Sequence, residues 1–197
     1  SAVKIAFDMV REKLISKKEA VLRIDPNSLD TLLHPTLDEK SKIMVIAKGL
    51  PASPGATSGK VVFSSDEAER LNDMMQNTIL VRVETSPEDI HGMHAAKGIL
   101  TARGGMTSHA AVVARGMGRP CVSGSSEIDI NYDEKTFRTS ELTVKEGDMI
   151  TLDGSTGRVI LGKVLTVKPQ ISGDFSKLMR WADKYRKLKI RTNSETP

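Results

Sequence analysis

The sequence predicts an α/β domain of the layered β/β/α type, with short helical segments at both ends. Between residues 41 and 165, strand patterns outnumber helical ones. Glycines that suit turns recur at short intervals through the same stretch. Apolar residues follow helical spacing before residue 40 and again near the C-terminus. Sheets covered by a few helices fit this pattern better than a doubly wound sheet, in which strands and helices alternate regularly.

The first 40 residues predict three short helices. Apolar residues recur at helical spacing over 3–14, and a second helix is expected over 17–22. A third begins near Asp25 and ends at His34, before a proline. Helices this short cannot be stable alone, so we expect them to pack on another part of the protein.

Ten strands and three helices are expected between residues 41 and 165. The strands are expected over 43–47, 60–64, 78–83, 98–102, 120–123, 128–131, 136–138, 142–145, 149–153 and 158–161. The helices are expected over 66–75, 87–96 and 108–116. The first two follow serines that can cap a helix, and the third follows a glycine-rich turn.

After residue 165 the pattern changes again. Proline and glycine interrupt it, and an amphipathic helix over 175–182 then leads to a strand-like segment over 187–192. We therefore expect a helical linker over 1–40, one domain over 41–165, and a linker with the first strand of a further domain over 166–197.

Composition excludes several classes of function. The 39% hydrophobic and 4% aromatic content predicts an aliphatic core. The net charge of +4 is concentrated near the C-terminus, but only Trp181 and Tyr185 accompany the basic residues there, so nucleic-acid binding is not expected. No apolar run approaches membrane-spanning length. The single cysteine, Cys121, fits a buried strand and a reducing compartment, and we expect a cytoplasmic location with an organelle left open.

A glycine-rich turn before the third helix carries the chemistry. Gly104 and Gly105 allow backbone angles closed to other residues and let the main chain approach a ligand. Thr107 and Ser108 can cap the helix or donate hydroxyls. His109 then lies in the first helical turn, where unpaired N–H groups and the helix dipole favour negative charge. Such a position suits a neutral, nucleophilic imidazole that becomes phosphorylated.

On geometry alone, other interpretations stay open. A lone histidine is more often a surface or hydrogen-bonded structural residue, and a double glycine often only turns the chain. His91 and His94 lie three apart on one predicted helix, a spacing compatible with metal ligation. No carboxylate–histidine pattern nearby completes a ligand set, so no metal site is expected. His34 is interpreted as a helix-end residue.

Residues 104–115 resemble the phosphohistidine signature of the phosphoenolpyruvate-utilising enzymes. Two further segments match in the same order: residues 49–59 resemble the family's entry strand and turn, and 146–157 its closing hairpin. The resemblance covers roughly residues 40–165. It implies a swivelling phosphohistidine domain in which the glycine-rich loop supports His109 as the carrier.

Within this family, finer features resemble the pyruvate phosphate dikinase branch. Met106 stands where an arginine is expected in phosphoenolpyruvate synthase and in enzyme I of the sugar phosphotransferase system. Segments 28–35, 85–90 and 116–124 resemble the dikinase, and 189–193 resembles the first strand of its C-terminal barrel. The alternatives are the equivalent domain of the synthase, which uses water in place of phosphate, and a stand-alone phosphocarrier or binding module.

The resemblance also implies a mechanism and partners. A dikinase is a phosphotransferase that interconverts ATP, phosphate and pyruvate with AMP, pyrophosphate and phosphoenolpyruvate. His109 would become a tele-phosphohistidine that shuttles between a preceding ATP-grasp domain and a following TIM barrel, in an enzyme expected to be a homodimer. Mg²⁺ would be bound on those neighbouring domains, and this stretch of chain alone would be inactive.

Three residues near His109 have candidate roles. Thr107 matches the threonine that is phosphorylated in plant dikinases to switch the enzyme off, and its alternative role is a helix cap or hydroxyl donor. Arg103 and Arg115 flank the histidine and are candidates for assisting transfer. Their alternative role is that of surface or helix-end arginines.

Overall fold

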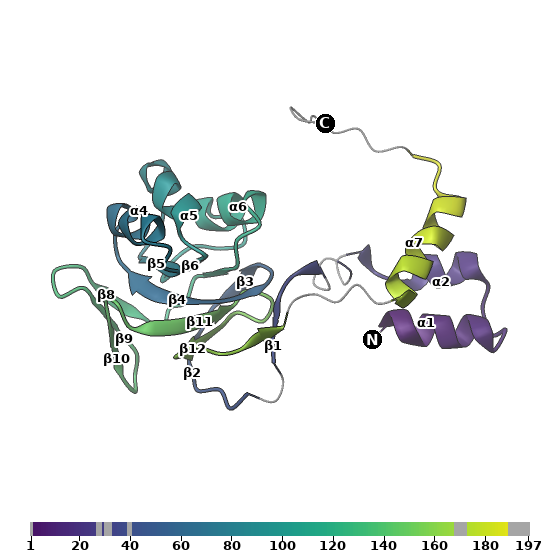
Figure 1. Ribbon diagram of the computed structural model, residues 1–197, viewed down its shortest axis with the longest axis horizontal. Helices are drawn as coiled ribbons and strands as arrows, with labels where there is room; N and C mark the ends of the chain where they lie inside the picture. The colour runs from purple at the N-terminus through teal and green to yellow at the C-terminus, as the bar shows by residue number, and fades with distance from the viewer. Residues whose placement is uncertain (1, 27–28, 30–32, 39–40, 168–172, 189–197) are drawn as a thin grey trace. The chain divides into compact units, whose positions relative to one another are not determined.

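The computed structural model describes residues 2–26, 29, 33–38, 41–167 and 173–188 (Figure 1). The chain divides into two units. One combines residues 1–33 with residues 170–197, and the other comprises residues 34–169.

The smaller unit is built from helices at both ends of the sequence. Helices α1 (Ala2–Arg11) and α2 (Lys17–Arg23) pack against α7 (Gly173–Tyr185). The rings of Phe7 and Trp181 stack with 4.3 Å between their centroids. The buried side chains of this cluster are Val3, Ala6, Ile15, Ala20, Ile24 and Leu178. The end helices that the sequence predicts therefore exist, and they bury apolar faces against one another.

The larger unit contains a mixed eight-stranded sheet in the order β2-β12-β11-β4-β5-β6-β7-β3. Strands β4 to β7 run parallel, and every other pairing in this sheet is antiparallel. The strands are β2 (Val45–Lys48), β3 (Leu50–Ser53), β4 (Ala56–Val62), β5 (Thr78–Arg82), β6 (Gly98–Thr101), β7 (Cys121–Ser123), β11 (Met149–Asp153) and β12 (Arg158–Leu161).

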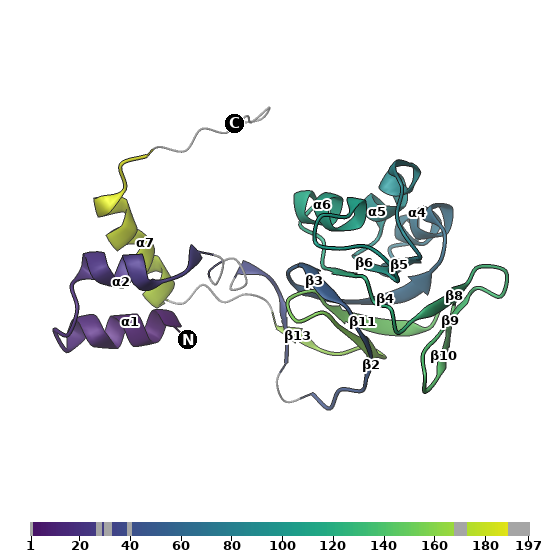
Figure 2. The same cartoon turned by 180° about the vertical axis from the view of Figure 1, so that it is seen from behind.

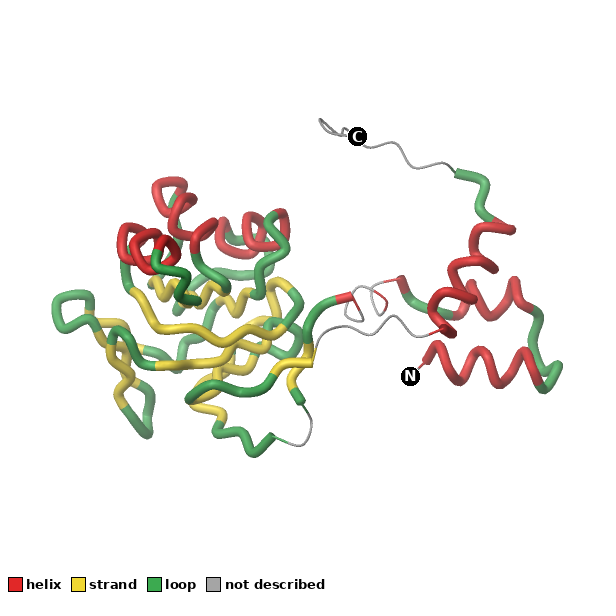
Figure 3. The backbone as a smooth tube through the Cα atoms, in the orientation of Figure 1, coloured by secondary structure: helices red, strands yellow, loops and turns green. Residues whose placement is uncertain are grey.

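Two small sheets complete the strands of this unit. One contains β8 (Asp129–Asn131), β9 (Thr136–Arg138) and β10 (Thr143–Lys145), all antiparallel. The other pairs β1 (Thr36–Leu37) with β13 (Thr166–Val167). In the tube view the strands of this unit are yellow and its helices are red (Figure 3).

Three helices cover one face of the parallel strands, and strands lie on the other face (Figures 1 and 2). They are α4 (Ser65–Asp73), α5 (Ile90–Ala95), which follows a 3₁₀ turn η2 (Pro87–Asp89), and α6 (His109–Gly116). Alternate residues of each central strand serve two separate cores. Val62, Leu80 and Ile99 pack under the helices, whereas their neighbours Val61, Ile79 and Leu100 pack on the opposite side.

This arrangement confirms the layered α/β class, and the ten predicted strands are present with shifts of a few residues at their ends. Strand β3 was not predicted as a strand from periodicity, because Pro51 interrupts it. Proline is tolerated there since β3 lies at the sheet edge and pairs only with β7. The two-residue strands β1 and β13 were not predicted either, because they show no strand pattern in the sequence. Much of the third helix expected before His34 and most of the strand expected over 187–192 fall outside the described residues.

Candidate active site around His109

His109 is the first residue of α6, as the glycine–serine pattern predicts. Ser108 is the N-cap, with extended backbone angles, and its Oγ accepts a hydrogen bond from the N–H of Ala111 at 3.4 Å. The remaining N–H groups of the first turn have no carbonyl partner within the helix. The positive end of the helix dipole therefore lies at His109, which is half-buried.

The imidazole is oriented by a threonine from a different loop. Thr85, three residues after β5 ends, places its Oγ1 3.1 Å from Nδ1 of His109. When the neutral ring donates Nδ1–H to this oxygen, its lone pair is on Nε2. In the sequence, Thr85 stands out only as the start of a segment that resembles the dikinase. The sequence gives no sign of this contact, because the two residues are 24 positions apart.

The loop before His109 is supported by hydroxyl groups. Thr101 Oγ1 donates to the carbonyl of Arg103 at 2.7 Å and lies 3.2 Å from Ser123 Oγ. Ser123 Oγ is in turn 3.3 Å from Ser108 Oγ. Gly104 has φ +110°, a region that other residues rarely adopt, and a Cβ there would meet Ser108 at 3.0 Å. The turn that presents His109 therefore needs glycine at this position, whereas a Cβ at Gly105 would meet nothing within 4 Å.

The two arginines near His109 have different surroundings. Arg115 donates from Nε to the carbonyl of Ala52 at 2.8 Å and from Nη2 to the carbonyl of Met106, so it ties the loop to β3. Arg103 is exposed. Within the described part of residues 34–169, it is the one arginine whose guanidinium has no hydrogen bond or ion pair. Within these residues the guanidinium of Arg103 is therefore unpaired, and that of Arg115 is bound to the loop and to β3.

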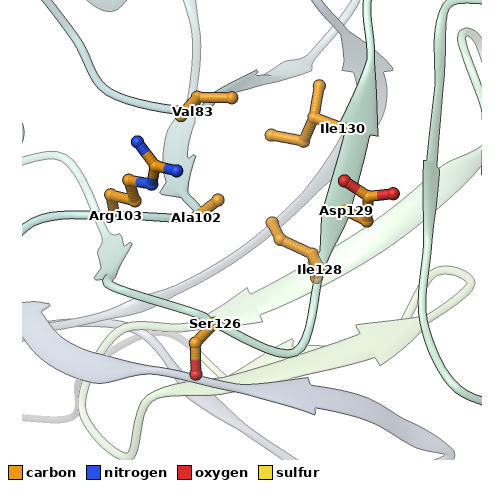
Figure 4. Close-up of a pocket in the computed structure, with 7 residues that line it drawn as sticks. All are labelled: Val83, Ala102, Arg103, Ser126, Ile128, Asp129 and Ile130. Atoms are coloured by element: carbon orange, nitrogen blue, oxygen red, sulfur yellow. The ribbon is translucent and has the colours of Figure 1, made fainter.

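A pocket lies at the same edge of the sheet as His109. It is lined by Val83, Ala102, Arg103, Ser126, Ile128, Asp129 and Ile130, and has a volume of about 300 Å³ (Figure 4). In the close-up, Ile128 and Ile130 face Arg103 and Ala102 across the space. The N–H of Arg103 donates to the carbonyl of Val83 at 2.9 Å, and the two segments continue from there to the glycine loop and to Thr85.

Other candidate residues lie away from this edge or are exposed. Thr107 is exposed in the turn before Ser108. His91 and His94 are exposed on α5 and line a second pocket with side chains of α4. Over the described ranges, no group of three or more His, Cys, Asp or Glu side chains could hold a metal ion. Cys121 is fully buried in β7, and this burial raises the pKa of its thiol to about 12.

Comparison with known protein families decides what this site belongs to. Residues 74–157 match the family PEP-utilising enzyme, mobile domain. The chain contains a mobile domain of the PEP-utilising enzymes. The matched stretch includes Thr85, the glycine loop and the whole of α6. His109 is therefore a residue of the mobile domain.

Several curated relatives match over the whole chain. It is 59% identical to a pyruvate, phosphate dikinase of Rhizobium meliloti (strain 1021), 56% to one of Clostridium symbiosum and 54% to a chloroplastic one of Flaveria pringlei. It covers 22%, 23% and 21% of their lengths, respectively, so the chain spans less than a quarter of these relatives.

One solved structure is also similar to part of the chain. An NMR solution structure of an Enzyme I protein matches 56% of this chain and 40% of its own, with 25% identity and a TM-score of 0.33. Separately, none of the helices in the described ranges is both long and apolar enough to cross a membrane.

Proposed function

We propose that this mobile domain is the phosphoryl carrier of a pyruvate, phosphate dikinase, with His109 as the transiently phosphorylated group. Identity of 52–59% to dikinases over the whole chain supports this branch of the family. The full enzyme would transfer phosphoryl between an ATP and phosphate site and a pyruvate or phosphoenolpyruvate site. His109 would shuttle between them as a tele-phosphohistidine.

The contact between Thr85 and His109 carries this proposal. Oγ1 lies 3.1 Å from Nδ1, and when Oγ1 accepts from Nδ1–H the free lone pair of the neutral ring is on Nε2. The ring lies at the N-terminus of an eight-residue helix, where a phosphoryl dianion is favoured. The tethered Nδ1, an Nε2 without a hydrogen-bond partner in the described part of the chain, and the positive end of the helix dipole together support a carrier role.

The transfer step follows from this arrangement. The Nε2 lone pair attacks phosphorus, an N–P bond forms, and the bond to the leaving oxygen breaks with its electron pair on that oxygen. The proton on Nδ1 stays shared with Thr85 Oγ1 until it passes to solvent. Thr85 then donates its own hydroxyl hydrogen to Nδ1. Return of a proton to Nδ1 makes the imidazole a better leaving group for the onward transfer.

The remaining parts of the reaction would be supplied by neighbouring domains. The groups that contact His109 and its loop are hydroxyls, main-chain groups and a guanidinium, a set that does not suit Mg²⁺, which prefers carboxylate ligands. We therefore assign Mg²⁺, ATP and pyruvate to an ATP-grasp domain and a TIM barrel of the full chain. Residues 1–40 and 166–197 would be the linkers of the moving domain, in a cytoplasmic homodimer.

Labelling of the full-length enzyme tests the proposal. Incubation with [³²P]phosphoenolpyruvate should give an adduct that is labile in acid and stable in alkali, as expected of a phosphoramidate. His109→Ala should abolish the label, while the matched His94→Ala, an exposed histidine of the same unit, should leave it unchanged. Label that survives in His109→Ala would place the carrier elsewhere.

A requirement for inorganic phosphate in the ATP half-reaction separates the dikinase from the synthase.

A further inference from the structure

A buried carboxylate lies behind the loop that holds Thr85. Asp89 is the last residue of the 3₁₀ turn before α5, and its side chain is 7% exposed. An ionised carboxylate at this depth is costly unless its oxygens are paired. The proposed phosphoryl transfer does not use Asp89 directly, so its burial calls for another explanation.

The oxygens of Asp89 connect three elements. Oδ2 accepts from the main-chain N–H of Ser86 at 3.0 Å, within the loop. Oδ1 accepts from Ser65 Oγ at 3.0 Å, at the start of α4. Arg82 Nε lies 3.4 Å from Oδ1, an ion pair at the end of β5 that lacks hydrogen-bond geometry within the described chain. Asp89 therefore joins both ends of the loop to the helix layer.

Thr85 lies between two of these anchored points. Arg82 precedes it by three residues, and Ser86, whose N–H is held by Asp89, follows it directly. Tyr132 also holds this loop. Its hydroxyl accepts from the N–H of Val83 at 2.8 Å, and the centre of its ring lies 5.1 Å from the guanidinium carbon of Arg82. The hydroxyl of Thr85 can meet Nδ1 of His109 only while this short segment keeps its path.

We propose that Asp89 is a positioning residue for His109, which sets the imidazole tautomer through Ser86 and Thr85. The inference deepens the proposed carrier function and rests on it. Asp89 fixes the main chain at Ser86, this fixes the Thr85 hydroxyl, and the hydroxyl, acting as acceptor, keeps the proton on Nδ1 so that Nε2 can attack. Asp89 itself touches neither His109 nor the phosphoryl group.

The first test reads the tautomer directly and needs no phosphorylation. The ¹⁵N-labelled 197-residue chain is compared with Asp89→Asn by long-range ¹H–¹⁵N NMR at pH 8.5, where an ordinary imidazole is neutral. In the wild type, His109 should carry its proton mainly on Nδ1, and in Asp89→Asn the ratio of the Nδ1–H to the Nε2–H form should fall severalfold. Glu88→Gln is the matched control, because it removes an exposed carboxylate of the same turn and should change nothing.

The second test asks whether Asp89 acts through Thr85. Phosphoramidate, a small phosphoryl donor, should modify Asp89→Asn and Thr85→Val each about tenfold to a hundredfold more slowly than the wild type, as expected when a reacting group is misplaced. If Asp89 works through Thr85, the double variant should be no slower than Thr85→Val alone. Should Asp89→Asn fail to fold, Arg82→Lys, which loosens the same loop at β5, should shift the tautomer in the same direction by less.

Three outcomes would overturn the proposal. A folded Asp89→Asn with the wild-type tautomer ratio shows that Asp89 is only structural. An equal shift in Glu88→Gln shows a general effect of charge. If the effects of Asp89→Asn and Thr85→Val on the rate of modification are fully additive, Asp89 does not act through Thr85. Failure of the carrier function itself is a different result: phosphoramidate would then not modify His109 in the wild type, while the tautomer comparison would still give its answer.

Discussion

At the residue scale, we expect negative charge placed beside His109 to oppose the transfer of a phosphoryl dianion to its ring. Thr107 is exposed two residues before His109, in the turn that caps α6. A phosphoryl group on Thr107 would add a charge of about −1.5 to −2 next to the group that His109 must receive. At an effective dielectric constant of about 20, two unit charges about 6 Å apart repel by about 3 kcal/mol.

We therefore predict that Thr107→Glu in the full-length enzyme slows phosphorylation of His109 by about a hundredfold. Thr107→Val, which has no charge and a similar shape, should keep most of the rate. The measurement is the pair of initial labelling rates with phosphoenolpyruvate. Equal rates in the two variants would show that charge at Thr107 does not control the transfer.

Burial makes Cys121 a second testable residue. The raised pKa of about 12, caused by loss of water around the thiol, keeps Cys121 protonated at any ordinary pH. We predict that iodoacetamide at pH 8 leaves the native chain unmodified and alkylates Cys121 once guanidinium chloride unfolds it. Mass spectrometry measures both. Alkylation of the folded chain at the rate of a free thiol would show that β7 is exposed.

Local patterns predicted the residues of the glycine loop and missed those that orient His109. The turn, cap and helix of 104–116 are contiguous in sequence, so their composition alone indicates how they fold. Thr85 contacts His109 from another loop, 24 positions away in the sequence, and a contact over such a separation follows from tertiary packing that periodicity does not record. Arg103 and Arg115 were both candidates for assisting transfer in the sequence, and the structure shows that the guanidinium of Arg115 is bound to the loop and to β3.

At the scale of elements, the loop that presents His109 depends on close contact with the segment after β7. Gly124 has φ +65°, and a Cβ there would lie 2.4 Å from the carbonyl oxygen of Gly104. Gly118 has nearly the same angle, φ +62°, but a Cβ there would meet nothing within 4 Å. The two glycines therefore separate the effect of backbone strain from that of a steric clash.

We predict that Gly118→Ala lowers the free energy of unfolding by about 1 kcal/mol, the usual cost of a side chain in the left-handed region. Gly124→Ala should lower it by about 3 kcal/mol or more, because the clash displaces the loop as well. Gly124→Ala should also slow phosphorylation of His109 by phosphoramidate. Urea denaturation and the labelling rate measure the two effects, and equal losses in both variants would refute the role of the close contact.

Strands were predicted correctly where a run of apolar side chains indicates burial. The central strands are continuous apolar runs, such as residues 79–81, which are buried on both faces. Strand β3 was harder to predict because its proline breaks the pattern, and its place is fixed by pairing with β7. The antiparallel strands β11 and β12 were predicted as strands, but their place beside β4 depends on the path of the whole chain, which no local window of sequence contains.

At the scale of the whole molecule, the two units have separate cores. Among the described residues, the helical cluster draws its buried side chains from 1–33 and 170–197, and the two cores around the large sheet draw theirs from 34–169. We predict that residues 34–169 produced alone unfold in one cooperative transition and react with phosphoramidate at His109 as fast as the whole chain. Thermal unfolding followed by circular dichroism tests this. A molten or aggregated product would show that the end segments are needed for folding.

The most direct test of the carrier proposal identifies the atom that receives phosphorus. Full-length enzyme labelled with ¹⁵N-histidine is reacted with phosphoenolpyruvate, and the coupling between ³¹P and ¹⁵N is measured by NMR. Because Thr85 engages Nδ1 at 3.1 Å, the phosphoryl group should be found on Nε2 of His109. Phosphorus on Nδ1, or on the hydroxyl of Thr107 or Ser108, would contradict the account.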